Sequence, residues 1–133
     1  MIVNTLLSFV DCLIWVAKTL CGPLHTKQAV EAYTQGLKDV VAQGGKIIYG
    51  NQVLEGPGNF VVPTITSISP DAPVVQHEIF VPILHTSKFK DLDDAIAKNN
   101  QVRQGLSSSL FTKDISNLFH WIGCVSIPPL FEG

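Results

Sequence analysis

This chain contains little charge and only a small excess of acidic over basic residues. Charged residues make up 15% of its 133 residues, well below the roughly 25% of a typical soluble domain. Nine lysines and arginines stand against eleven aspartates and glutamates, which gives a formal net charge of −2. A chain without a basic field does not attract phosphate backbones, so the composition argues against nucleic-acid binding. Because 46% of the residues are hydrophobic, we expect the chain to cover part of its surface with a partner.

Cysteines are also few, and their pattern excludes two structural roles. The sequence has three of them, Cys12, Cys21 and Cys124, an odd number without a C-x-x-C pair. This pattern predicts neither a disulfide framework nor a zinc knuckle, and it indicates a reducing compartment. Cys12 and Cys21 are each interpreted as a small buried hydrophobic group.

The histidines lack the spacing of a metal site. They are scattered along the chain as His25, His77, His85 and His120. No two of them are placed at i, i+4 on a helix or on facing strands, where two imidazoles can share one ion. We expect no metal site.

No apolar run is long enough to cross a bilayer. Residues 1–17 are mostly apolar, but they fall short of about 20 residues, lack a basic start and contain Asn4 and Asp11. The segment is therefore interpreted as an amphipathic or buried helix. A membrane-anchored or secreted protein stays an alternative to that interpretation.

Hydrophobic spacing and turn residues predict alternating helices and strands. Helices are expected over residues 26–42, 92–98 and 115–122, the last two capped by Asp91 and Asp114. Strands are expected over residues 46–50, 60–68, 81–89 and 106–111. Pro63, inside the second strand, predicts a sheet edge or a bulge. The alternation is typical of an α/β fold, and the apolar runs favour parallel strands with helices on both faces.

Three phrases, in a fixed order, carry the strongest functional signal. Residues 58–65 read Gly-Asn-Phe-Val-Val-Pro-Thr-Ile, residues 77–82 read His-Glu-Ile-Phe-Val-Pro, and residues 99–112 read Asn-Asn-Gln-Val-Arg-Gln-Gly-Leu-Ser-Ser-Ser-Leu-Phe-Thr. They resemble the aldehyde dehydrogenase superfamily. The Gln-Gly-Leu-Ser-Ser-Ser wording resembles its antiquitin-like branch, which oxidises α-aminoadipic semialdehyde in lysine breakdown. The resemblance spans residues 19–123 and leaves residues 1–18 and 124–133 unmatched.

The resemblance implies a fold, a cofactor and two binding residues. The fold is part of the family's catalytic domain, an α/β layer with a mostly parallel sheet and flanking helices, and the cofactor is NAD. Glu78 would accept hydrogen bonds from the nicotinamide ribose hydroxyls, and Phe80 would pack near the nicotinamide ring. A carboxylate accepts two hydroxyl donors at once, and an aromatic face restrains a flat ring. Taken without the family, Glu78 is a solvated carboxylate and Phe80 a core residue.

One residue of the second phrase departs from the family. Val81 stands where a glycine is usual and where this branch carries alanine. The extra methyl groups of valine are expected to crowd the nicotinamide end of the site.

Much of the family's chemistry has no counterpart in this sequence. Aldehyde oxidation needs a thiolate, a general base and a nucleotide-binding fold. The family's nucleophile has a Gly-Gln-x-Cys type of context, which Cys12 and Cys21 do not share, and Cys124 lies just past the match. There is no G-x-G-x-x-G loop. No catalytic residue is assigned, and we expect an inactive fragment of an enzyme of the cytoplasm or the mitochondrial matrix.

A non-catalytic role is the alternative. Apolar composition together with open sheet edges favours association with other chains. Under this hypothesis the protein binds full-length aldehyde dehydrogenase subunits.

Overall fold

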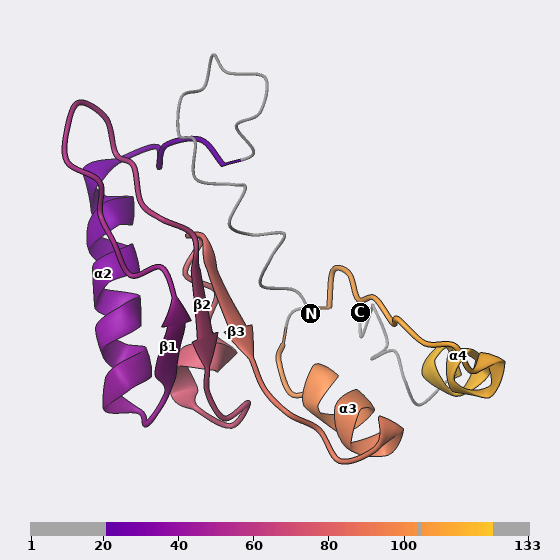
Figure 1. Ribbon diagram of the computed structural model, residues 1–133. Helices are drawn as coiled ribbons and strands as arrows, with labels where there is room; N and C mark the ends of the chain where they lie inside the picture. Colours follow the sequence, from indigo (N-terminus) through magenta and orange to yellow (C-terminus); the bar gives the residue numbers. More distant parts are fainter. Residues whose placement is uncertain (1–20, 104, 124–133) are drawn as a thin grey trace. The chain divides into compact units, whose positions relative to one another are not determined.

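The computed structural model describes residues 21–103 and 105–123, which belong to two compact units divided between Ser87 and Lys88 (Figure 1). In their described residues, the first unit carries one α-helix, a short 3-10 helix and a sheet, and the second unit carries two α-helices. The apolar segment of residues 1–17 and the tail of residues 124–133 lie outside the described residues, as do Cys12 and Cys124. Within the described ranges no helix is long and apolar enough to span a bilayer.

Helix α2, Lys27–Ala42, is the long helix of the first unit. It begins at Thr26, whose hydroxyl accepts a hydrogen bond from the Ala29 amide at 3.2 Å. It ends before Gly44, which has the left-handed φ of 82° that suits glycine at a helix end. Its buried residues lie along one face of the helix: Ala29, Tyr33, Gly36, Leu37 and Val40. The predicted helix over residues 26–42 is confirmed, because its caps and its apolar stripe both lie in the local sequence.

The sheet has three short strands in the order β1-β2-β3, namely Lys46–Tyr49, Thr64–Ser67 and Ile83–Thr86. Strands β1 and β2 are antiparallel, whereas β2 and β3 are parallel. The prediction of a mostly parallel sheet is therefore wrong, and the sheet is mixed. The cause lies in the connection over residues 50–63, which folds back as a hairpin arm. Its two sides are joined by a bridge between Val53 and Val61.

Pro63 lies just before the first residue of β2, and β2 is the central strand. The prediction of a sheet edge at this point is wrong. The ladder between β1 and β2 instead shifts register between Ile47 and Tyr49, beside Ile65, which fits the bulge alternative. Because the strand starts after the proline, its missing N–H removes no ladder bond.

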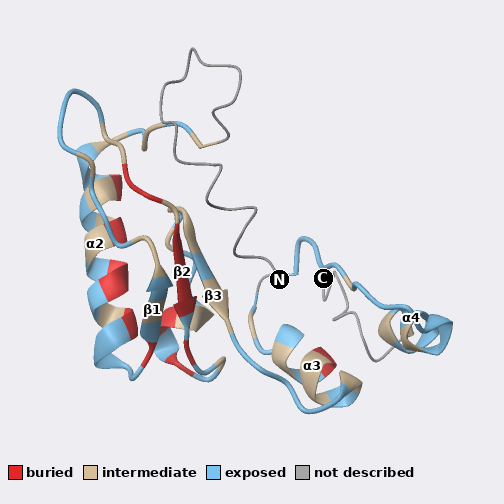
Figure 2. Ribbon diagram, in the orientation of Figure 1, coloured by how far each residue is buried: buried red, intermediate tan, exposed pale blue. Residues whose placement is uncertain are grey.

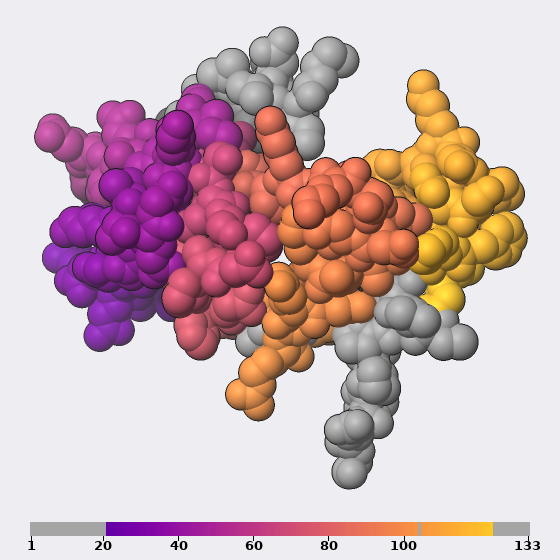
Figure 3. Space-filling view, turned by 90° about the horizontal axis from the view of Figure 1, so that it is seen from below, coloured from indigo at the N-terminus to yellow at the C-terminus, as the bar shows by residue number. Residues whose placement is uncertain are grey.

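The core of the first unit lies between α2 and one face of the sheet (Figure 2). Two buried clusters fill it: Tyr33, Leu37 and Val61 form one, and Val40, Ile68, Ala72 and Val74 form the other. The space-filling view shows α2, in indigo to purple, directly against the pink segment that contains the short 3-10 helix η2, Pro73–Gln76 (Figure 3). Among the described residues of this unit, α2 is the α-helix that covers the sheet, on one face.

The second unit contains α3, Leu92–Asn99, and α4, Ile115–Trp121. The predicted caps are confirmed: Asp91 accepts from the Asp94 amide at 2.9 Å, and Asp114 accepts from the Ser116 amide at 2.9 Å. Between the two helices, His120 Nε2 lies 2.8 Å from the Asp93 carboxylate.

The strand predicted over residues 106–111 is not formed. These residues have irregular backbone, and Leu106 and Phe111 are each 96% exposed. A strand is stable only when a neighbouring strand pairs with its backbone groups. Among the described residues the sheet consists of β1, β2 and β3, and no described segment pairs with residues 106–111. An alternating pattern of apolar and polar residues does not by itself provide a strand for these residues to pair with.

Candidate functional site

Glu78 and Phe80 lie in the connection that leads from η2 to β3. Both are exposed, and 78% of the Phe80 surface is accessible. The interpretation of Phe80 as a core residue is therefore wrong. Among the described residues none donates a hydrogen bond to the Glu78 carboxylate, so both of its oxygens are available as acceptors.

Phe80 has a backbone conformation that is rare for a bulky residue. Its φ is 56°, in the left-handed region, where a side chain is strained by roughly 1–3 kcal/mol. The residues on either side explain why it stays there. Ile79 packs against the cluster of Val40 and Val74, and Val81 packs against the cluster of Tyr33 and its neighbours. With both neighbours held inward, the turn between them directs Phe80 outward.

The turn is also fixed on the strand side. The Ile83 amide donates to the Val81 carbonyl at 2.7 Å, and the Thr64 amide of β2 donates to the Pro82 carbonyl at 2.9 Å. These bonds anchor the end of the second phrase to the middle strand of the sheet. A strained, anchored turn that presents an aromatic side chain and a carboxylate is typical of a binding site.

Val81 lies differently from the sequence-based expectation. Its side chain is partly buried and packs against the cluster of Tyr33, Leu37 and Val61 beneath α2. The methyl groups therefore face the interior of the unit. Crowding of the exposed side of the turn by Val81 is not supported by this placement.

Helix α2 approaches the turn closely at Gly36. A Cβ atom added there would lie 2.7 Å from Ile79 Cδ1, closer than real Cβ atoms come to other atoms. Glycine inside a helix costs roughly 0.5–1 kcal/mol relative to alanine. Gly36 therefore leaves room beside α2 for the end of the side chain of Ile79, the residue that precedes the strained Phe80.

The first phrase, residues 58–65, is joined to the loop that precedes α2. The Leu24 amide donates to the Asn59 carbonyl at 2.8 Å, and Asn59 Nδ2 donates to the Leu24 carbonyl at 3.2 Å. The pair brings together two segments that are far apart in sequence. His25, which adjoins this loop, is exposed. The sequence predicted a strand and a family resemblance for this phrase, but not the structural role of Asn59.

A buried polar contact below the same phrase was also missed. The Tyr33 hydroxyl lies 2.8 Å from the Val62 carbonyl and 2.6 Å from Thr64 Oγ1. Thr64 Oγ1 also accepts a hydrogen bond from the Asn51 amide at 2.8 Å. Tyr33 and Thr64 are each 1% exposed, so the network is dry. A tyrosine within the apolar stripe of α2 was the available signal, because a buried hydroxyl requires a partner.

Cysteine and histidine residues do not assemble a reactive centre in the described part of the chain. Cys21 is half-buried, with its Sγ 3.7 Å from the Gly22 carbonyl. Across residues 21–103 and 105–123 no three His, Cys, Asp or Glu side chains are placed to hold a metal ion. His85 Nδ1 lies 2.8 Å from Thr66 Oγ1, and burial lowers the pKa of this imidazole from its ordinary value.

Comparison with known proteins gives the family. The sequence pattern of the aldehyde dehydrogenase family matches residues 15–127. The chain belongs to this family. It is 59% identical over 105 residues to aldehyde dehydrogenase family 7 member A1 of Pisum sativum. It is also 48% identical over 110 residues to α-aminoadipic semialdehyde dehydrogenase of Mus musculus. The antiquitin-like assignment is confirmed.

These matches cover most of this chain and a small part of each relative. The pea match includes 79% of the chain and 21% of the relative, and the mouse match includes 82% and 20%. The chain therefore spans about a fifth of the length of the curated relatives.

Solved structures agree with the fold. 1-Pyrroline-5-carboxylate dehydrogenase from Thermus with bound NAD matches this chain with a TM-score of 0.71 at 26% identity. It covers 75% of this chain, and the chain covers 19% of it. The described α/β elements thus match part of an aldehyde dehydrogenase fold.

Proposed function

We propose that this chain supplies nicotinamide-ribose contacts in an NAD-dependent enzyme that oxidises α-aminoadipic semialdehyde in lysine breakdown. The observation that carries the proposal is the anchored turn of residues 77–82, which presents Glu78 and Phe80 to solvent from a strained backbone. Identity to family 7 members supports the substrate class. We propose a location in the cytoplasm or the mitochondrial matrix for this enzyme.

The two exposed side chains fit the nicotinamide end of NAD. The Glu78 carboxylate receives no hydrogen bond from any described residue and has two acceptor oxygens for vicinal hydroxyls. Phe80 offers an exposed ring for a flat partner. NAD, when bound, accepts the hydride that the aldehyde carbon loses on oxidation. This chain's own residues would hold and orient the nicotinamide ribose.

The role of Glu78 is tested in a full-length enzyme. In the pea relative, the matching segment is replaced by that of this chain, and steady-state kinetics are measured with and without Glu78→Gln. Losing a charge-assisted hydrogen bond costs roughly 1.5–3 kcal/mol, so kcat/KM for NAD should fall about tenfold or more. The matched control is Glu55→Gln, an exposed glutamate in the β1–β2 connection. Equal kinetics for both variants would contradict the assignment.

We further propose that the 133-residue chain does not oxidise aldehydes by itself. Cys21 is the one cysteine in the described ranges, and its Leu-Cys-Gly context differs from the Gly-Gln-x-Cys type of context of the family's nucleophile. The proposal is that the thiolate and the nucleotide-binding fold come from polypeptide outside this sequence.

A second candidate function is binding to full-length aldehyde dehydrogenase subunits without catalysis. Large apolar side chains on the second unit favour it: Leu106 and Phe111 are 96% exposed, Ile115 is 69% exposed and Phe119 is 65% exposed. Exposed apolar surface of this kind marks contact sites. The pea relative, of which the match includes only 21%, has further polypeptide that would cover it.

This second candidate has a direct test by gel filtration of purified chain mixed with the purified pea enzyme. Co-elution is expected, and the variant carrying Leu106→Ser and Phe111→Ser should elute separately. Ser107→Ala, at an exposed position between them, is the matched control and should co-elute. Separate elution of the unmodified chain at micromolar concentration would refute binding.

A further inference from the structure

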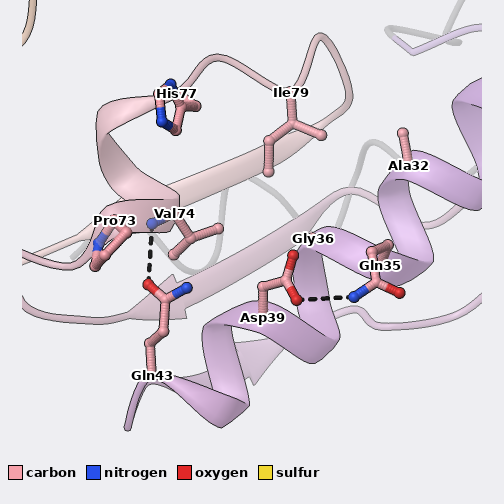
Figure 4. Close-up of a pocket in the computed structure, with 9 residues that line it drawn as sticks. All are labelled: Ala32, Gln35, Gly36, Asp39, Gln43, Pro73, Val74, His77 and Ile79. Atoms are coloured by element: carbon pink, nitrogen blue, oxygen red, sulfur yellow. Dashed lines mark hydrogen bonds between the residues drawn. The ribbon is translucent and has the colours of Figure 1, made fainter.

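A hollow of about 360 Å³ lies between α2 and the segment that runs from η2 to Ile79 (Figure 4). It belongs wholly to the first unit, and neither Glu78 nor Phe80 lines it, although their chain neighbours His77 and Ile79 do. Its lining residues come from two segments: Ala32, Gln35, Gly36, Asp39 and Gln43 on the helix side, and Pro73, Val74, His77 and Ile79 opposite.

The floor of the hollow is apolar. Ala32 and Gly36 present small residues on the helix side, and Val74 and Ile79 present branched side chains opposite (Figure 4). Gly36 has no side chain at the point where Ile79 Cδ1 approaches, so the helix backbone itself forms part of the wall. Such a floor favours a ligand with a hydrocarbon body.

The two walls are held together at one end. Gln43 Oε1, at the end of α2, accepts a hydrogen bond from the Val74 amide at 2.9 Å (Figure 4). This bond fixes η2 against the helix and satisfies an amide at the start of the 3-10 turn. The hollow is therefore built into the fold of this unit and does not depend on a mobile segment.

Asp39 is the acidic residue among those that line the hollow. It is half-buried, and its Oδ1 accepts a hydrogen bond from Gln35 Nε2 at 2.8 Å. In the described part of the chain it has no ion pair, and nothing donates to its second oxygen. A carboxylate beside an apolar surface, with one neutral donor, is stabilised most by a cation that brings its own hydrogen-bond donors.

We propose that this hollow binds a small organic cation with an apolar body, of the alkylammonium class. The ammonium group lies against the Asp39 carboxylate, and the hydrocarbon part covers Ala32, Val74 and Ile79. Charge complementarity selects the cation, and an acid of the same length is repelled. The site is separate from the proposed contact with NAD and does not depend on it.

The test is an NMR titration of the nitrogen-15 labelled chain with n-hexylammonium, 1-hexanol and hexanoate. A seven-heavy-atom ligand at ordinary ligand efficiency gives a dissociation constant on the order of 1 mM. We expect n-hexylammonium to shift amides of the lining residues. Under the same conditions 1-hexanol binds at least about fivefold more weakly and hexanoate does not bind.

Two variants test the contribution of the Asp39 charge separately from that of the space in the hollow. Asp39→Asn keeps the shape of the side chain and should reduce n-hexylammonium affinity to that of 1-hexanol. Ala32→Leu fills the hollow with a good helix former and should abolish both. Glu55→Gln, an exposed acid outside the hollow, is the control and should change nothing. Equal affinity for the amine and the alcohol, shifts centred elsewhere, or no shifts at tens of millimolar would overturn the proposal.

Discussion

Removing the Tyr33 hydroxyl should lower the stability of the first unit by an amount that its contacts define. The hydroxyl is buried, with the Val62 carbonyl at 2.8 Å and Thr64 Oγ1 at 2.6 Å. In Tyr33→Phe both contacts are lost, each with a net value of roughly 0.5–1.5 kcal/mol. The Val62 carbonyl keeps the hydroxyl of Thr64 at 3.0 Å, so no acceptor is orphaned. The expected loss is about 1–2 kcal/mol.

Thr64→Val provides the informative comparison. This change leaves the Asn51 amide without its acceptor and removes a partner of Tyr33. Because the partly buried Asn51 amide loses its acceptor while a bond to Tyr33 is also lost, the loss should exceed that of Tyr33→Phe, at about 2–3 kcal/mol. The double variant should lose less than the sum of the two single losses, because both changes act on one network.

The assay is urea unfolding of the full chain followed by far-ultraviolet circular dichroism, which reports on α2. A loss of 1–2 kcal/mol corresponds to a fall in Tm of roughly 5–15 °C for a domain of this size. Thr34→Ala, which removes a hydroxyl bonded within the same helix, is a control with a smaller expected effect. A loss below about 0.5 kcal/mol for Tyr33→Phe would refute the described network.

Two further predictions concern Val81 and His85. Val81→Ala should cost about 1 kcal/mol in unfolding free energy, since it removes partly buried methyl groups that pack under α2, and unchanged stability would place this side chain in solvent. Burial lowers the pKa of His85 below its ordinary 6.5, so the unfolded chain takes up a proton at higher pH than the folded chain. Stability should therefore be fully present above pH 6.5 and fall as the pH is lowered through 6.5 toward the folded pKa. Urea midpoints across this range should lose that dependence in His85→Gln and keep it in His25→Gln; the same slope in both would contradict it.

The helices could be predicted from the sequence because their signals are local. Thr26, Asp91 and Asp114 each sit where a side chain can accept a first-turn amide, and each does so in the structure. Nothing beyond a few neighbouring residues is required for such caps. The ends of α2 and α3 accordingly agree with the prediction to within one or two residues.

The direction of strand pairing could not be predicted in the same way. Alternating and continuous apolar runs indicate a strand, but its partner is distant in sequence and its direction depends on the connection. The hairpin arm around Val53 and Val61 turned an expected parallel pair into an antiparallel one. The segment of residues 106–111 had strand-like composition and lacks a pairing partner among the described residues.

Glu78 and Phe80 were identified as candidate site residues from the resemblance to a known family. Their geometry, in contrast, is determined by the packing of neighbouring residues. No local property of Phe80 predicts a left-handed, exposed phenylalanine, because that conformation results from the inward packing of Ile79 and Val81. Gly36 on a different element contributes through its close approach to Ile79. The Asp39 hollow likewise exists only once α2 and η2 are brought together.

The most direct measurement is NADH formation by the purified 133-residue chain with NAD and α-aminoadipic semialdehyde, beside the full-length pea relative as a positive control. We predict no NADH above the buffer rate for the chain alone and steady formation by the relative. NADH formation that rises in proportion to the concentration of this chain and is abolished by Cys21→Ala would contradict the account. Such a result would mean that the chain contains a catalytic thiol in addition to Glu78 and Phe80, which are proposed only to bind NAD.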